Sequence, residues 1–137
     1  MKNKKLISSI ITLFLICIPV SFANASTYSE KSNHKTVSIK IGSSNKIVLH
    51  TTYWQLSSVK GNAIKIVGQP EVQPIMPGPT APANCQVPGT GCGIVSTTFV
   101  AKSAGISVIT FLRNSCGEVL KCTPAQRVYQ IKVKVTK

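Results

Sequence analysis

The chain has 137 residues, of which 43% are hydrophobic, and 16 lysines and arginines face only three acidic residues, a formal net charge of +13. This length suits one domain. Acid–base enzymes commonly use tuned carboxylates or histidines, so a chain this poor in both is a weak candidate for such catalysis. The positive charge favours anionic partners.

The first 25 residues have the order of a secretory signal peptide. Met1–Lys5 is basic, Leu6–Phe22 is almost uninterrupted apolar, and Ala23-Asn24-Ala25 is a small-x-small cleavage site. We therefore expect an exported protein, periplasmic or secreted, with no integral membrane segment once the signal is removed. The mature chain would start at Ser26 and keep 112 of the 137 residues; three lysines leave with the signal, so its formal charge would be +10.

Six segments with period-two patterning or compact apolar runs predict β-strands. They are Thr36–Ile41, Lys46–Leu49, Ala63–Val67, Ile94–Lys102, Ile106–Leu112 and Gln126–Val135. Alternate residues of the last strand, from Tyr129 to Val135, form one apolar face, which predicts a half-buried strand. Both faces of Ile106–Leu112 are largely apolar, so this strand is expected in the centre of its sheet. His50–Trp54 fits either a loop or a further strand, with Trp54 packed inward.

No segment after the signal has the apolar spacing of a helix. Six or seven short strands in about 110 residues predict an all-β fold, an immunoglobulin-like β-sandwich of about seven strands. We place this domain at residues 36–137, after a flexible tail at 26–35. Within it, residues 69–92 are rich in proline and predict a long loop. That loop would be functional, a crossing between two sheets, or a partly disordered insertion.

Four cysteines follow the signal, namely Cys85, Cys92, Cys116 and Cys122. An even number of cysteines in an exported chain predicts disulfides. Pairing each cysteine with its sequence neighbour would staple two loops locally, which we slightly favour, whereas pairing across would tie the two loops together. Six and five intervening residues do not fit the C-x₂-C spacing of zinc sites. We expect neither a metal nor a cofactor.

Binding is better supported than catalysis. The remaining carboxylates are widely spaced, His34 and His50 lie outside metal motifs, and there is no G-x-S-x-G elbow or phosphate loop. Export and the lack of an arginine-rich run argue against nucleic acid. Acidic proteins, lipid headgroups and envelope polymers remain as anionic partners, although the charge could serve solubility alone. The loops His50–Trp54, Pro88–Gly93 and Arg113–Ala125 could share one end of a sandwich and bind a protein.

Several motifs resemble the chagasin-like family of cysteine-peptidase inhibitors. Gly89-Thr90-Gly91-Cys92-Gly93 resembles the glycine-rich G-x-G-G loop of that family, and Lys102-Ser103-Ala104-Gly105 its K-x-x-G turn. Thr110-Phe111-Leu112-Arg113 resembles the strand that enters R-P-W, and Val37–Leu49 with Trp54 resembles the first strands. This resemblance implies an immunoglobulin-like sandwich in which three end-loops enter the cleft of papain-like peptidases. It implies binding residues at the following positions: Thr51, Thr52, Trp54, Gly91, Gly93 and Arg113.

The chain departs from the family pattern in two loops. The family's first loop carries N-P-T-T-G, whereas here only His50-Thr51-Thr52-Tyr53 separates Leu49 from Trp54. Asn114-Ser115 follows Arg113 in place of proline and tryptophan. A shorter wedge buries less surface in a cleft. The alternative hypothesis is therefore a structural or adaptor domain of the cell envelope or a secretion assembly, which binds an envelope protein and has no inhibitory activity.

Overall fold

The computed structural model of this chain describes residues 25–86, 89, 91–117 and 120–137. The predicted signal peptide therefore lies outside the described residues, apart from its last residue. In these ranges, no helix has both the length and the apolar character needed to span a membrane.

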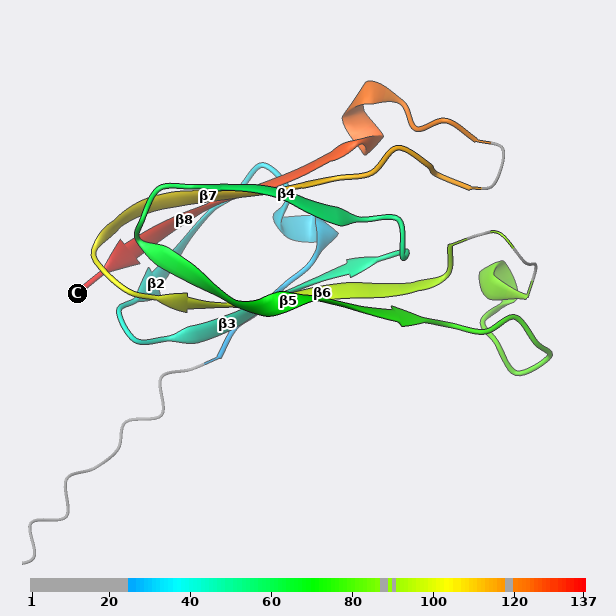
Figure 1. The fold of residues 1–137 in the computed structure, drawn as a ribbon, viewed down its shortest axis with the longest axis horizontal. Helices are drawn as coiled ribbons and strands as arrows, with labels where there is room; N and C mark the ends of the chain where they lie inside the picture. Colours follow the sequence, from blue (N-terminus) through cyan, green and yellow to red (C-terminus); the bar gives the residue numbers. More distant parts are fainter. Residues whose placement is uncertain (1–24, 87–88, 90, 118–119) are drawn as a thin grey trace, which may run out of the picture.

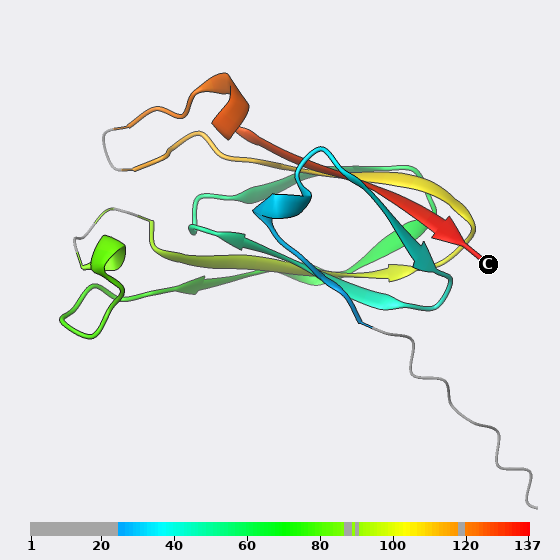
Figure 2. The same cartoon turned by 180° about the vertical axis from the view of Figure 1, so that it is seen from behind.

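Eight strands form two four-stranded sheets (Figures 1 and 2). In chain order they are β1 (Thr27–Tyr28), β2 (Thr36–Lys40), β3 (Ser44–His50), β4 (Gln55–Lys60), β5 (Ile64–Pro74), β6 (Gly93–Ala101), β7 (Gly105–Leu112) and β8 (Val128–Thr136). Sheet A has the order β1-β3-β6-β5 and sheet B the order β2-β8-β7-β4. The helical turns of the described residues are short 3₁₀ segments, η1 (Glu30–Ser32), η2 (Ala83–Cys85) and η3 (Pro124–Gln126). The predicted immunoglobulin-like sandwich is confirmed.

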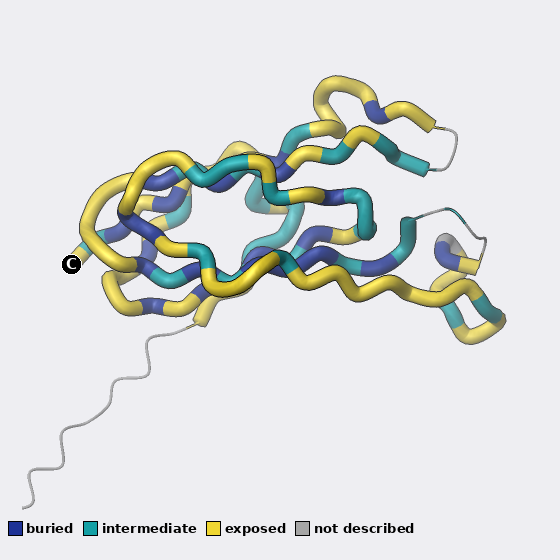
Figure 3. Tube along the Cα trace, viewed as in Figure 1, coloured by how far each residue is buried: buried dark blue, intermediate teal, exposed yellow. Residues whose placement is uncertain are grey.

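The core lies between the two sheets, and Figure 3 shows buried and exposed residues alternating along the strands. The apolar face predicted for the last strand is buried throughout, from Tyr129 to Val135. Ile109 and Phe111 of β7 meet Ile131 and Tyr129 of β8 in the ladder and are fully buried. The prediction that β7 is central is confirmed, because it lies between β8 and β4.

The short connection from β6 to β7 passes from one sheet to the other. Lys102-Ser103-Ala104 joins them, yet β6 pairs with β3 and β5 while β7 pairs with β4 and β8. Lys102 and Ser103 both donate backbone hydrogen bonds to the Ala63 carbonyl, at 2.8 and 3.2 Å. The β4–β5 corner therefore anchors this crossing.

The prediction of a loop over residues 69–92 was wrong for its first part. Strand β5 continues to Pro74, and Glu71–Pro74 pair with residues of β6 after an irregularity between Val67 and Glu71. Proline is tolerated here because β5 is the edge strand of sheet A, where a missing N–H can face solvent. Proline-rich sequence thus marks an edge strand up to residue 74, and the loop starts at Ile75.

The segment 26–35 is also more ordered than the predicted flexible tail. Thr27 and Tyr28 add a parallel strand to β3, and the Tyr28 ring stacks on Phe99 at 6.3 Å between centroids. Glu30 accepts hydrogen bonds from the backbone N–H of His50 and from its ring Nδ1, the latter at 3.0 Å. The tail prediction fails because these partners are 19 or more residues away along the chain, so local composition does not indicate them.

Candidate functional site

Three connections lie at one end of the sandwich, which we call the three-loop end. They are the β3–β4 turn (51–54), the β5–β6 loop (75–92) and the β7–β8 loop (113–127), whereas the β6–β7 connection lies at the opposite end (Figure 1). The predicted gathering of end-loops is confirmed. Their spatial order, with the β3–β4 turn in the middle, places both disulfide-bearing loops on its flanks (Figure 1).

The β3–β4 turn is hydrogen-bonded to the glycine-rich end of the β5–β6 loop. The Thr51 N–H donates to the Gly93 carbonyl at 2.8 Å, and the Thr52 N–H donates to the Gly91 carbonyl at 2.7 Å. The Tyr53 hydroxyl donates to the Gly89 carbonyl at 2.8 Å. Three consecutive residues of the turn are therefore held by one partner loop.

Gly91 and Gly93 stand where any side chain would collide with neighbouring segments. Gly91 has φ +62°, and a Cβ at this position would overlap the Tyr53 ring. Gly93, the first residue of β6, has φ +137°, and its Cβ would overlap the Gln73 backbone carbonyl of β5 and meet the Thr52 methyl group at 2.8 Å. Left-handed backbone and close approach both favour glycine. The glycines that resemble the family's G-x-G-G loop therefore leave space here for the Tyr53 ring and the Thr52 methyl group.

The turn itself contains one strained residue. Thr51 has φ +82°, a region that β-branched residues rarely occupy. Its Oγ1 accepts a hydrogen bond from the Tyr53 N–H at 3.3 Å. Strain of this kind persists only where surrounding contacts fix the backbone, and the bonds from the turn to Gly91 and Gly93 supply them.

Trp54 and Arg113 connect the turn to the β7–β8 loop. Trp54 is 5% exposed, and its ring meets Tyr129 edge-on at 6.5 Å between centroids. The Arg113 guanidinium carbon lies 4.5 Å from the centroid of the Trp54 ring, and Arg113 Nε donates to the Gln126 carbonyl at 2.7 Å. Burial lowers the pKa of Arg113, while Glu30 acts to raise it. The stacked cation fixes the start of the loop against the core.

Both flanking loops are closed by local disulfides, as favoured from the sequence. Cys85–Cys92 has a Cα–Cα distance of 5.5 Å, and Cys116–Cys122 one of 5.1 Å. In the second loop, Ser115 and Lys121 form an isolated β-bridge beside the disulfide. Short cross-links reduce the conformations open to each loop before binding.

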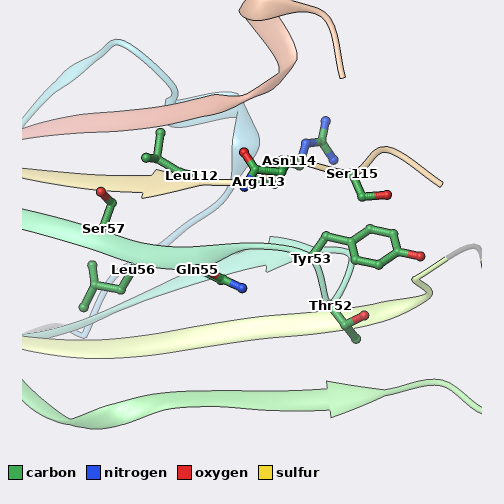
Figure 4. Close-up of a pocket in the computed structure, with 9 residues that line it drawn as sticks. All are labelled: Thr52, Tyr53, Gln55, Leu56, Ser57, Leu112, Arg113, Asn114 and Ser115. Atoms are coloured by element: carbon green, nitrogen blue, oxygen red, sulfur yellow. The ribbon is translucent and has the colours of Figure 1, made fainter. Parts of the chain in front are cut away.

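Two hollows flank the β3–β4 turn. One, of about 350 Å³, lies between the turn, the start of β4 and the β7–β8 loop (Figure 4). Its lining residues are Thr52, Tyr53, Gln55, Leu56, Ser57, Leu112, Arg113, Asn114 and Ser115. The other, of about 400 Å³, is lined from the opposite side by Ile75, Pro82 and the Cys85–Cys92 region. The turn therefore forms a low ridge between the two depressions, and the two longer flanking loops extend past it (Figure 1).

Exposed apolar side chains add to this end of the molecule. Met76 is 77% exposed and Ile75 41% in the β5–β6 loop, and Leu120 is 68% exposed in the β7–β8 loop. Exposed apolar groups gathered on loops favour an interaction surface.

The structure brings the six predicted binding residues together, in three different positions. Thr51 and Thr52 belong to the ridge, Gly91 and Gly93 accept its hydrogen bonds, and Trp54 is buried in the core. Arg113 is partly exposed and borders both hollows. Their use in binding remains a prediction.

Sequence reasoning missed Tyr53, Ile75 and Met76. Tyr53 follows two threonines and precedes the only tryptophan, in a connection that is too short to bury the tyrosine side chain. An aromatic residue in so short a turn was the sequence signal that could have identified it. Ile75 and Met76 lie within the proline-rich run 69–92, whose composition gives no sign of exposed apolar side chains.

The described residues hold no group of three or more His, Cys, Asp and Glu side chains arranged to bind a metal ion. His50 is largely exposed, and its ring Nδ1 lies 3.0 Å from a Glu30 carboxylate oxygen. This pair secures the N-terminal segment to the end of β3.

No family model and no curated protein sequence matches the chain. Several solved structures match the chain, and two of them show the similarity in fold. Amebosin aligns with a TM-score of 0.54 and 19% identity, over 82% of this chain and 99% of the other. A cysteine protease inhibitor from Entamoeba histolytica aligns with a TM-score of 0.54 and 16% identity, over 82% of this chain and 96% of the other. The chagasin-like fold expected from the sequence motifs is confirmed.

Proposed function

We propose that this protein is an exported inhibitor of papain-like cysteine peptidases, and that the three-loop end blocks their cleft without any chemical step. The observation that carries the proposal is the ridge of Thr51, Thr52 and Tyr53, hydrogen-bonded to Gly89, Gly91 and Gly93. A ridge fixed before binding loses little conformational entropy on association, which favours affinity from a small contact. The inhibitor with a similar fold supports this choice of partner.

Features beside the ridge support a macromolecular contact rather than a small ligand. One hollow lies on each side of the ridge. Ile75, Met76 and Leu120 are exposed on the flanking loops. A peptidase surface could cover the ridge and these apolar side chains together. Two local disulfides in these loops also support an exported location, since disulfides persist in oxidising compartments.

Titration of papain with the purified protein tests the proposal. We expect reversible inhibition at micromolar concentration or below, without cleavage of the protein. Thr52→Arg places a bulky charge on the ridge and should weaken inhibition strongly. Ala104→Arg introduces the same side chain in the exposed β6–β7 connection at the opposite end and should leave inhibition unchanged. Absence of inhibition, or equal loss in both variants, would refute the proposed function.

The structural or adaptor function in the envelope remains a second candidate, and the exposed Ile75 and Met76 favour it as much as they favour a peptidase. Replacing both residues with serine leaves the hydrogen-bonded ridge in place. A stable envelope partner that is lost in this double variant, together with a wild-type protein that does not inhibit papain, would establish the adaptor. Deletions for this test must begin after Ile75, because residues 69–74 belong to the edge strand β5.

A further inference from the structure

The outer face of sheet B carries lysines together with aliphatic side chains. Lys40 of β2, Lys60 of β4, and Lys132 and Lys134 of β8 are all exposed. Lys132 and Lys134 point away from the core, because Ile131, Val133 and Val135 between and beside them are buried. The four strands of this sheet contain no aspartate or glutamate. We name this surface the sheet B face.

Strand register arranges these lysines on one surface. Lys132 pairs with Val108 of β7, and Val108 pairs with Lys60 of β4, so Lys60 and Lys132 flank Val108. Strands are spaced about 4.8 Å apart, so these two lysines start about 10 Å from each other, and Lys134 follows Lys132 by about 7 Å. In the described residues, none of these lysines forms an ion pair. Lysines on edge strands can prevent aggregation. This role does not explain Lys132 and Lys134, because β8 is a central strand of sheet B.

Aliphatic side chains lie among the lysines. Ile106 pairs with Lys134 in the ladder and is 55% exposed, and Leu112 on the same side of β7 is 39% exposed. Positive charge alone fits any anionic polymer. Charge combined with exposed aliphatic groups fits the boundary between lipid headgroups and acyl chains, where apolar side chains are also buried. We propose that the sheet B face docks this protein on an anionic lipid surface.

This docking is independent of the proposed inhibition and leaves room for it. The sheet B face runs along the side of the sandwich, whereas the three loops lie at its end (Figure 1). If the sheet B face lies on the membrane, the three-loop end remains accessible at the end of the sandwich. Each lysine close to an anionic bilayer strengthens binding about fivefold, so three of them contribute about a hundredfold.

Sedimentation with vesicles tests the proposal. All described strands lie after residue 25, so the chain from Ser26 onward contains the whole sandwich and is used here. It should bind vesicles of phosphatidylcholine with about 30% phosphatidylglycerol, should not bind pure phosphatidylcholine, and should be released by salt. The triple variant Lys60→Gln, Lys132→Gln, Lys134→Gln should lose about a hundredfold in affinity.

A matched variant separates the face from net charge. Lys31→Gln, Lys46→Gln and Lys65→Gln remove the same charge from η1 and sheet A, and this variant should retain most of the vesicle binding. Equal loss in both triple variants would overturn the proposal, as would wild-type protein that ignores anionic vesicles.

Ile106→Gln distinguishes a lipid from a hydrated polymer. It should weaken vesicle binding severalfold while leaving binding to dextran sulfate unchanged. If the wild-type protein binds dextran sulfate but not anionic vesicles, the face recognises a polyanion and the lipid proposal is wrong. Thermal unfolding of each variant checks that the sandwich is intact.

Discussion

Gly91→Ala tests whether the ridge depends on its glycine-rich seat. The added Cβ would overlap the Tyr53 ring, and the backbone at φ +62° is unfavourable for alanine. The backbone cost is about 1 kcal/mol. If the ring moves away, the hydrogen bond from its hydroxyl to Gly89 is also lost, at about 1 kcal/mol. We expect a total loss of about 2–3 kcal/mol in the free energy of unfolding, together with weaker papain inhibition.

Two other glycines provide controls for this variant. Gly68 has φ +71° but open space around its Cβ, so Gly68→Ala isolates the backbone cost of about 1 kcal/mol. Gly78 lies in the same loop as Gly91, with no positive φ and no neighbour within 4 Å, so Gly78→Ala should be close to neutral. Urea unfolding gives the three values, and papain inhibition measured well below the unfolding midpoint separates loss of binding from loss of folded protein.

Removing the tyrosine completes the test. In a Tyr53→Ala background the overlap is absent, so Gly91→Ala should cost only the backbone part, about 1 kcal/mol. The reasoning fails if Gly91→Ala costs no more than Gly68→Ala in the wild-type background. It fails equally if the cost is the same with and without Tyr53.

Three further predictions concern single side chains. Tyr129→Phe should stabilise the fold by about 1 kcal/mol, because the buried hydroxyl has no partner in the described residues. Burial also raises the pKa of Tyr129, so wild-type stability should fall as pH rises past about 10, and urea midpoints of the variant should lack that part of the fall. Thr51→Asn should raise the thermal midpoint by relieving φ +82°, since asparagine tolerates left-handed backbone, with a gain of about 1 kcal/mol. Arg113→Lys should cost about 1 kcal/mol and change the fluorescence of Trp54, the only tryptophan, because lysine cannot reproduce the planar stack; unchanged fluorescence would contradict this.

Local patterns in the sequence predicted the features of the fold that depend on neighbouring residues. Period-two alternation from Tyr129 to Val135 identified the buried face of β8, and the apolar faces of Ile106–Leu112 identified a central strand. Short cysteine spacing was consistent with local disulfides. Each of these properties is decided over a few residues, so composition and spacing carry the information.

Features that depend on distant partners were missed. Residues 69–74 become a strand because β6 offers them an edge, and this pairing outweighs a composition typical of loops. Thr27 and Tyr28 become a strand because β3 has a free edge. Tyr53 matters because Gly91 leaves space for its ring. No local pattern reports whether such a partner will be present.

The short β3–β4 turn explains why the glycine-rich loop matters so much in this chain. In the chagasin-like pattern the turn has its own proline and glycine, and both are absent here. Thr51 instead takes the positive φ, and the turn is held by hydrogen bonds to Gly89, Gly91 and Gly93. Rigidity that a turn lacks internally must come from its neighbours. The β3–β4 turn and the β5–β6 loop therefore form one structural unit, which the Cys85–Cys92 disulfide fixes at Cys92, between Gly91 and Gly93.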